Sequence, residues 1–262
     1  LPVSHPDILE FVHCKEGGAN LAQINYSISV TRKFMLTARK NRDWKLVNPR
    51  TGKVVNTINA QTLLETAARL AWKTGDPGII FVDRINQDNP TPHVGVLETV
   101  NLCGEQPLLS YEACNLGSVN LAEHVDGSEV DWKKLAGTVK TAVRFLDDVV
   151  SVCEYPLTEV AKTVRGNRKI GLGVMGWADM LVKLGVSYGS KKSIKMAEEV
   201  MKFVTTTGHK ESEKLGKEKG SFPNYKGSSW EKKGYKHFRN ATVTTIAPTG
   251  TISILADTSS GI

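Results

Sequence analysis

The feature that most constrains the fold is an alternation of short apolar runs with longer segments of helical periodicity. Within residues 20–36, apolar and polar side chains alternate from Ile24 to Val30, which predicts a strand followed by a helical turn. A second strand is predicted at 78–83, and we expect it to be buried. Strands that alternate with helices favour an α/β fold with largely parallel strands.

The predicted helices have recognisable ends. Asn59 suits an N-cap and the sequence GDPG ends that helix, while Asp131 begins a long helix that stops before Pro156. We see neither an internal repeat nor a domain boundary. The other predicted elements are a helix at 190–216, a strand at 170–174 that turns at Gly176 into a helix ending at Gly185, and a strand, turn and helix within 240–255.

Composition argues against several classes of protein. Four cysteines in 262 residues do not make a disulfide framework, which favours a reducing cytoplasm. No apolar run reaches the length of a membrane span, and no signal peptide is visible, so we expect no membrane contact. The chain begins at Leu1 rather than Met, and we expect a segment of a longer protein.

The net charge of +7 is concentrated in two lysine-rich stretches, 189–195 and 214–239. A nucleic-acid-binding patch is one interpretation, but no stacking motif or reader helix accompanies the lysines. We therefore favour a solvated surface segment at 214–239 and predict no nucleic-acid partner. An excess of basic over acidic residues also suits the binding of small polyphosphate substrates.

The stretch 101–118, NLCGEQPLLSYEACNLGS, contains the most chemistry. Asn101, Cys103 and Glu105 alternate, so an extended or gently looped backbone would present an amide, a thiol and a carboxylate on one side. Gly104 and Pro107 argue against a helix here. A carboxylate beside a thiol raises the pKa of the thiol, which suits a sulfur that reacts as a radical while the carboxylate accepts a proton.

The remaining cysteines have weaker signals. Cys114 follows Cys103 at a spacing that fits neither a redox pair nor a zinc knuckle, and we predict no metal site. By composition alone, every cysteine here could be a small buried apolar side chain. We expect that role for Cys14 and for Cys153, which lies on an apolar helix face.

A second candidate site is APTGTIS at 247–253, between a predicted strand and a predicted helix. Hydroxyls and backbone N–H groups at a helix N-terminus favour anion binding, although a plain β-turn has the same sequence pattern. The candidate substrate-binding residues are Pro248, Thr249, Gly250, Thr251, Ile252 and Ser253.

The stretch NLCGEQPLLSYEACNLGSVNL closely resembles the finger loop of ribonucleotide reductase large subunits. The form CGEQPL…CNLGS is similar to the adenosylcobalamin-dependent class (class II) rather than to the iron-dependent class. Further blocks resemble the same family in the same order, and the lysine-rich 214–239 region is only loosely similar. These blocks are HPDILEFV, WKLVNPRTGKVV, AWKTGDPGIIFVDRIN, RKIGLGVMGWADML and APTGTISILADTSSGI.

The resemblance implies a fold, a cofactor and partners. The fold would be part of a ten-stranded α/β barrel with a central finger loop, and residues 1–262 would be its central part, without the first strands, the effector loop and the C-terminal portion. The cofactor would be adenosylcobalamin, and a thioredoxin-type protein would act as reductant. A homodimer or a complementary polypeptide would complete the assembly.

The resemblance also implies residue roles. Cys103 would be the thiyl radical that removes the 3′ hydrogen of a ribonucleotide, Glu105 would accept the 3′ hydroxyl proton, and Asn101 would hold the ribose hydroxyls. Cys114 would belong to a dithiol pair whose other member lies upstream in the family, and we do not assign Cys14 to that role. Residues 248–253 would hold the substrate phosphates.

Two alternatives stay open at this point. The chain could be a non-catalytic nucleotide-binding fragment that assembles with a complementary chain, or it could belong to the iron-dependent class of the same family. The choice between a diphosphate and a triphosphate substrate is also open.

Overall fold

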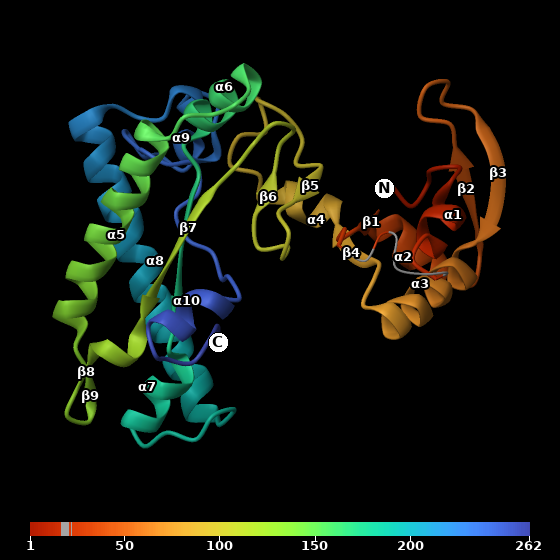
Figure 1. The fold of residues 1–262 in the computed structure, drawn as a ribbon. Coiled ribbons are helices and arrows are strands. Elements are labelled where there is room, and N and C mark those ends of the chain that lie inside the picture. The colour runs from red at the N-terminus through yellow and green to blue at the C-terminus, as the bar shows by residue number, and fades with distance from the viewer. Residues whose placement is uncertain (17–20, 22) are drawn as a thin grey trace. The chain divides into compact units, whose positions relative to one another are not determined.

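The computed structural model describes residues 1–16, 21 and 23–262, which form two compact units (Figure 1). The first unit covers Leu1–Asp88 and the second Asn89–Ile262. The sequence showed no boundary between them. Part of the predicted 20–36 strand segment, at residues 20 and 22, lies outside the described residues.

The first unit combines a parallel strand pair with an antiparallel hairpin. β1 pairs with β4 in parallel, whereas β2 and β3 form the hairpin. Its elements are α1 (Ile8–His13), β1 (Ser27–Val30), α2 (Arg32–Arg39), β2 (Asp43–Val47), β3 (Val54–Asn59), α3 (Ala60–Thr74), β4 (Gly78–Phe81) and α4 (Val82–Gln87).

Local sequence explains the helix ends of this unit. The Asn59 side chain accepts a hydrogen bond from the Thr62 amide at 3.0 Å, which confirms the predicted N-cap of α3. Gly75 ends α3 in the left-handed conformation that glycine adopts without strain. The prediction that 78–83 is buried is wrong, because β4 pairs with β1 alone among described strands and leaves Phe81 44% exposed.

The second unit is built around one parallel strand pair, β7 and β10, packed against long helices. Its first elements are β5 (Thr99–Val100), β6 (Pro107–Leu108), β7 (Asn115–Asn120), η2 (Leu121–His124), β8 (Val125–Asp126), β9 (Glu129–Val130) and α5 (Trp132–Val152). The others are α6 (Thr158–Asn167), β10 (Ile170–Met175), α7 (Trp177–Lys183), α8 (Lys191–Lys219), η3 (Pro223–Tyr225), α9 (Ser229–Lys232) and α10 (Gly250–Leu255).

β10 is buried along its whole length and is the centre of this unit. β7 pairs with it on one edge, from Ile170 opposite Asn115 to Met175 opposite Asn120. On the other edge lie residues 242–245, which make backbone hydrogen bonds with β10 and one parallel bridge at Thr244. The strand predicted there is therefore an extended segment with a single bridge, whereas the predicted strand at 170–174 is confirmed.

The helices that cover this sheet follow the predicted apolar periodicity. Asp131 caps α5 by accepting a hydrogen bond from the Lys134 amide at 2.9 Å. α5 and α8 lie side by side (Figure 1) and bury Leu135, Val139 and Val143 against the sheet. α8 continues to Lys219, beyond the predicted end at 216. Among the described residues, no helix is both long and apolar enough to span a membrane.

The interpretation of 214–239 as a solvated surface segment is wrong in part. Its first residues belong to α8, and Phe222, Trp230 and Phe238 are buried in the core of the second unit. Trp230 and Phe238 stack with ring centroids 4.0 Å apart. The lysines of this segment remain on the surface, because their charged ends require water.

This aromatic cluster predicts a pH-dependent stability. The His209 ring contacts Trp230 and Phe238, with centroid distances of 5.0 and 5.7 Å. Burial first, and then the charge of Lys233, lower the pKa of His209 from its ordinary value of 6.5. The unfolded chain therefore binds a proton more readily, and the folded state loses stability as the pH falls below about 6.5.

We expect the free energy of unfolding to decrease between pH 7 and pH 5, as measured by urea denaturation at several pH values. The variant His209→Gln should show a flatter profile over this range, because its amide does not titrate. Equal pH slopes for the wild type and the variant would show that other groups cause the effect.

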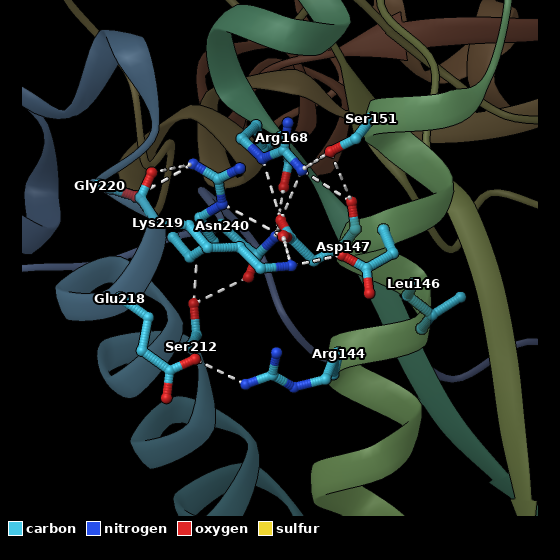
Figure 2. A network of polar contacts seen from close by, with 12 residues as sticks. Arg144, Leu146, Asp147, Ser151, Arg168, Ser212, Glu218, Lys219, Gly220 and Asn240 are labelled. Carbon is cyan, nitrogen blue, oxygen red and sulfur yellow. Dashed lines mark hydrogen bonds and ion pairs between the residues drawn. The ribbon is translucent and has the colours of Figure 1, made fainter.

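A buried polar network joins α5 to the start of β10 (Figure 2). Asp147, whose side chain is fully buried, accepts hydrogen bonds from Arg168 Nε at 2.9 Å, Asn240 Nδ2 at 3.0 Å and Arg239 Nε at 3.1 Å. Arg168 also bonds to Ser151 at 2.8 Å. These bonds fix the backbone directly before β10, and so fix the strand on which the candidate site is built.

Candidate functional site

The stretch that contains Asn101, Cys103 and Glu105 forms the tip of a β-hairpin between β5 and β6. The Asn101 and Gln106 backbones are hydrogen-bonded at 3.1 Å, and the Asn101 side-chain oxygen accepts from the Gln106 amide at 2.9 Å. Gly104 has a φ of 87°, which closes the turn. The segment is not helical, as expected, but it is a tight turn and not the extended or gently looped backbone that the spacing predicted, because a left-handed glycine and a side-chain cap fold it back on itself.

The hairpin tip presents Cys103 to solvent. Its thiol is free, and both it and the neighbouring Leu102 are exposed. The side-chain oxygen of Asn101 is used in a hydrogen bond within the loop, so the Nδ2 group of this side chain is available to a ligand.

Glu105, unlike Cys103, is partly buried. Its Oε2 atom is buried and has no hydrogen-bond partner, which is costly unless a ligand or a proton satisfies it. Its backbone carbonyl accepts a hydrogen bond from Thr245 Oγ1 at 3.0 Å. Glu105 lines a cavity of about 360 Å³ together with Met201 and residues 244–246. Neither Cys103 nor residues 248–253 are among its lining residues.

Glycines in β10 allow the loop to approach the sheet closely. A Cβ atom at Gly171 would lie 2.5 Å from Gln106 Nε2, and one at Gly173 would lie 2.7 Å from the Thr245 carbonyl oxygen. The alternation of glycine with buried apolar residues in IGLGVM is the signal in the sequence that identifies this face of β10 as a contact surface.

Cys114 is half-buried at the start of β7. Burial chiefly raises the pKa of its thiol to about 12, while Lys169 opposes this effect and Glu112 and Glu105 add to it. The sequence predicted an un-ionised thiol beside a carboxylate at Cys103, and the structure shows such an environment at Cys114. A thiol of this kind stays protonated at neutral pH.

The other two cysteines differ from expectation. Cys14 and Cys153 are both exposed, so the prediction that they are small buried apolar residues is wrong. Cys153 directly follows α5 and has an extended backbone, so it is not part of the apolar face of the helix. Among the residues that the structure describes, no group of three or more His, Cys, Asp and Glu side chains could hold a metal ion.

The 247–253 segment forms the predicted turn followed by a helix, α10. Thr249 adopts a left-handed conformation with φ of 59°, and its hydroxyl accepts a hydrogen bond from the Gly261 amide at 2.7 Å. The Ser253 hydroxyl donates to the Gly250 carbonyl at 3.0 Å. Both hydroxyls are therefore engaged, and the exposed Thr251 and the first N–H groups of α10 remain for an anion.

Sequence reasoning missed a polar cluster at the carboxyl end of the central strands. Asp179 accepts hydrogen bonds from the Thr258 hydroxyl at 2.8 Å and the Ser259 amide at 2.7 Å. These bonds lower the pKa of Asp179, the Ser259 amide having the largest effect. A Cβ atom at Gly176, whose φ is 71°, would clash with Asn120 and Thr258. The absence of a side chain at this position therefore leaves room for the residues that follow α10, Thr258 among them.

Residues 1–238 match the family described as ribonucleotide reductase, barrel domain. The chain is 49% identical over 264 residues to the vitamin B12-dependent ribonucleoside-diphosphate reductase of Thermoplasma acidophilum, which covers all of this chain and 34% of that protein. The protein of the same name from Mycobacterium tuberculosis strain CDC 1551 is 45% identical over 263 residues, with 100% of this chain and 38% of that protein covered.

A more distant relative is the ribonucleoside-diphosphate reductase subunit alpha of Chlamydia pneumoniae, which is 35% identical over 208 residues, or 78% of this chain and 20% of that protein. The chain thus spans about a third of the length of the B12-dependent relatives. The match over residues 1–238 and the identities over the full length lead to one conclusion: the chain belongs to the ribonucleotide reductase barrel-domain family.

Proposed function

We propose that residues 1–262 are the central part of the catalytic barrel of an adenosylcobalamin-dependent reductase that converts ribonucleotides to deoxyribonucleotides. The observation that carries this proposal is the buried, unpartnered Oε2 atom of Glu105, on the same hairpin tip as Asn101 and Cys103. The names of the relatives favour a ribonucleoside diphosphate as substrate and the B12-dependent class over the iron-dependent class.

In this proposal the hairpin tip starts the reaction. Cys103, as a thiyl radical, removes the 3′ hydrogen atom of the ribose, and the Glu105 carboxylate accepts the proton of the 3′ hydroxyl. The Nδ2 group of Asn101 donates a hydrogen bond to a ribose hydroxyl. A buried oxygen without a partner is suited to this task because the substrate hydroxyl supplies the missing hydrogen bond.

The reduction then needs two electrons, which a dithiol pair supplies by closing to a disulfide while the 2′ hydroxyl leaves as water. Cys114 is the member of that pair in this chain. Its raised pKa supports the role, because a thiol that stays protonated can give up a proton together with its electrons. A thioredoxin-type dithiol then reopens the disulfide.

The substrate phosphates would lie at 248–253. Thr251 and the first N–H groups of α10 offer donors there, and the segment follows directly from residues 244–246, which line the cavity beside Glu105. This arrangement supports a nucleotide that extends from the cavity toward α10. We propose no nucleic-acid or membrane partner and a cytoplasmic location.

Adenosylcobalamin would act at the exposed tip of the hairpin. When bound, it supplies the one-electron chemistry that converts the Cys103 thiol to a thiyl radical. The fit to this chain rests on the exposure of Cys103, because a group of this size can reach the sulfur only from outside the loop. We assign no residue of this chain as its ligand.

The proposed fold is part of a ten-stranded barrel around the finger loop. β7, β10 and the extended segment 242–245 would be three neighbouring strands of it, with the Asn101–Gln106 hairpin on their inner side. The rest of the barrel would come from the longer protein, with a homodimer or a complementary polypeptide completing the site.

Replacement of Cys114 tests this scheme. In the full-length protein with adenosylcobalamin and a thioredoxin-type reductant, Cys114→Ser is expected to stop multiple turnovers of ADP, because serine cannot form the disulfide. Rapid-quench measurement of dADP should separate any first turnover from the steady state. A normal steady-state rate would remove Cys114 from the reductant pair.

The alternatives have distinct outcomes. Activity with adenosylcobalamin and no second subunit excludes the iron-dependent class. A full-length protein that binds ADP but forms no dADP under these conditions would favour the non-catalytic nucleotide-binding role.

A further inference from the structure

Lys169 is a buried cation directly before β10. It contacts the segment between Glu105 and Cys114 at two points. Its side chain is 1% exposed. Its Nζ atom lies 2.6 Å from Glu112 Oε2 and donates a second hydrogen bond to the Pro107 carbonyl at 3.1 Å. One ammonium group therefore joins the beginning of β6 to the turn that follows it.

Glu112 is fully engaged in this contact. Its Oε2 atom also accepts from the Leu109 amide at 2.8 Å, and its Oε1 atom accepts from Asn167 Nδ2 at 2.6 Å. Asn167 in turn accepts from Asn224 at 2.9 Å. A buried ion pair of this kind adds little net stability compared with an apolar pair of the same volume, but it fixes a geometry.

The two points that Lys169 holds lie between Glu105 and Cys114 in the chain. Pro107 follows Glu105 closely in the chain, and Glu112 precedes Cys114 by two residues. On its other side Glu105 is held by the hydrogen bond from Thr245. The charges of Lys169 and Glu112 also act on the Cys114 thiol, in opposite directions. Movement of this ion pair would displace both the carboxylate and the thiol.

We propose that Lys169 is a positioning residue for nucleotide reduction: its buried ammonium holds Pro107 and Glu112, and so keeps Glu105 and Cys114 in place against β10. This inference rests on the proposed function. It differs from a purely structural role because it requires the charge and the hydrogen bonds of Lys169 as well as the volume of its side chain.

The test uses the double variant Lys169→Met/Glu112→Gln in the full-length protein. It removes both charges and keeps the volume, so no unpaired buried charge remains and the chain is expected to unfold cooperatively near the wild-type midpoint. We expect kcat for ADP reduction to fall about 10- to 100-fold, because small displacements of reacting groups have effects of this size. KM for ADP should stay within about twofold.

Lys183→Met is the matched control. Lys183 also donates to a backbone carbonyl, that of Ala122, at 2.7 Å and lies 3.8 Å from Glu123, but it is half exposed and does not contact the loop. Its variant should have wild-type kcat and KM. If the double variant does not fold, Lys169→Arg replaces it: the charge remains, but the bulkier guanidinium cannot occupy the same position, and kcat should fall severalfold.

Wild-type kcat in whichever Lys169 variant folds would overturn the inference, as would a raised KM with unchanged kcat, which indicates a binding role. Failure of the proposed function appears differently. In that case the wild-type protein itself would form no dADP, or Cys103→Ser would be as active as the wild type.

Discussion

Replacing Cys103 with serine is expected to abolish ribonucleotide reduction, with a loss of at least about 1,000-fold in kcat. A serine hydroxyl holds its hydrogen too strongly to form the corresponding oxygen radical under the conditions in which a thiol forms a thiyl radical. Cys103 is exposed at the tip of the hairpin, so the change removes no packing contact from the core. Binding of ADP, measured by isothermal titration calorimetry, should remain within about twofold of the wild type, or a change of less than about 0.5 kcal/mol.

Cys153→Ser is the matched control for this experiment. Cys153 is also a free, exposed cysteine, but it lies at the end of α5, away from the hairpin loop in the sequence. Its variant should have wild-type activity. Turnover by Cys103→Ser at a rate close to that of the wild type would show that the sulfur takes no part in the reaction.

Replacing Asp147 with alanine is expected to destabilise the second unit by about 3–5 kcal/mol, because it leaves the buried Arg168 guanidinium without a counter-charge. Asp147 accepts hydrogen bonds from Arg168 and Asn240 (Figure 2). It also accepts one from Arg239, and its side chain is 0% exposed. Arg168 is itself buried and cannot turn to solvent without moving the start of β10. Urea denaturation followed by tryptophan fluorescence measures the loss.

The neighbouring residue provides the control for this measurement. Asp148 forms an ion pair with Lys219 at the surface, where its side chain is 50% exposed. Asp148→Ala should reduce stability by less than about 1 kcal/mol, because water screens an exposed pair. Equal losses in the two variants would mean that burial of the Asp147 network does not determine its contribution.

Several elements could be predicted because their causes are local. Asn59 and Asp131 cap helices with their own side chains, and Gly75 ends a helix with its own backbone conformation. The strand at 170–174 and the helix after Gly176 follow from residues within a few positions of each other. The resemblance to the reductase family likewise depended only on the order of short motifs, and the match over residues 1–238 confirms it.

The predictions from the sequence were wrong where burial or strand pairing depends on residues far apart in the chain. Cys14 and Cys153 are exposed although their local patterns predicted burial, because burial depends on which elements pack against a side chain. Phe222, Trp230 and Phe238 enter the core from a lysine-rich segment for the same reason. The 242–245 segment makes only one bridge, which depends on its distant partner β10.

For the candidate site, the sequence by itself determined which groups are present: an amide, two thiols and a carboxylate in one short stretch, followed much later by a hydroxyl-rich turn. Only the tertiary structure decided their environment. It folds Asn101–Gln106 into a tight hairpin, leaves Glu105 Oε2 buried without a partner, and brings Lys169 onto Glu112. The physical reason is that desolvation and charge pairing act through space, between residues that the order of the chain does not bring together.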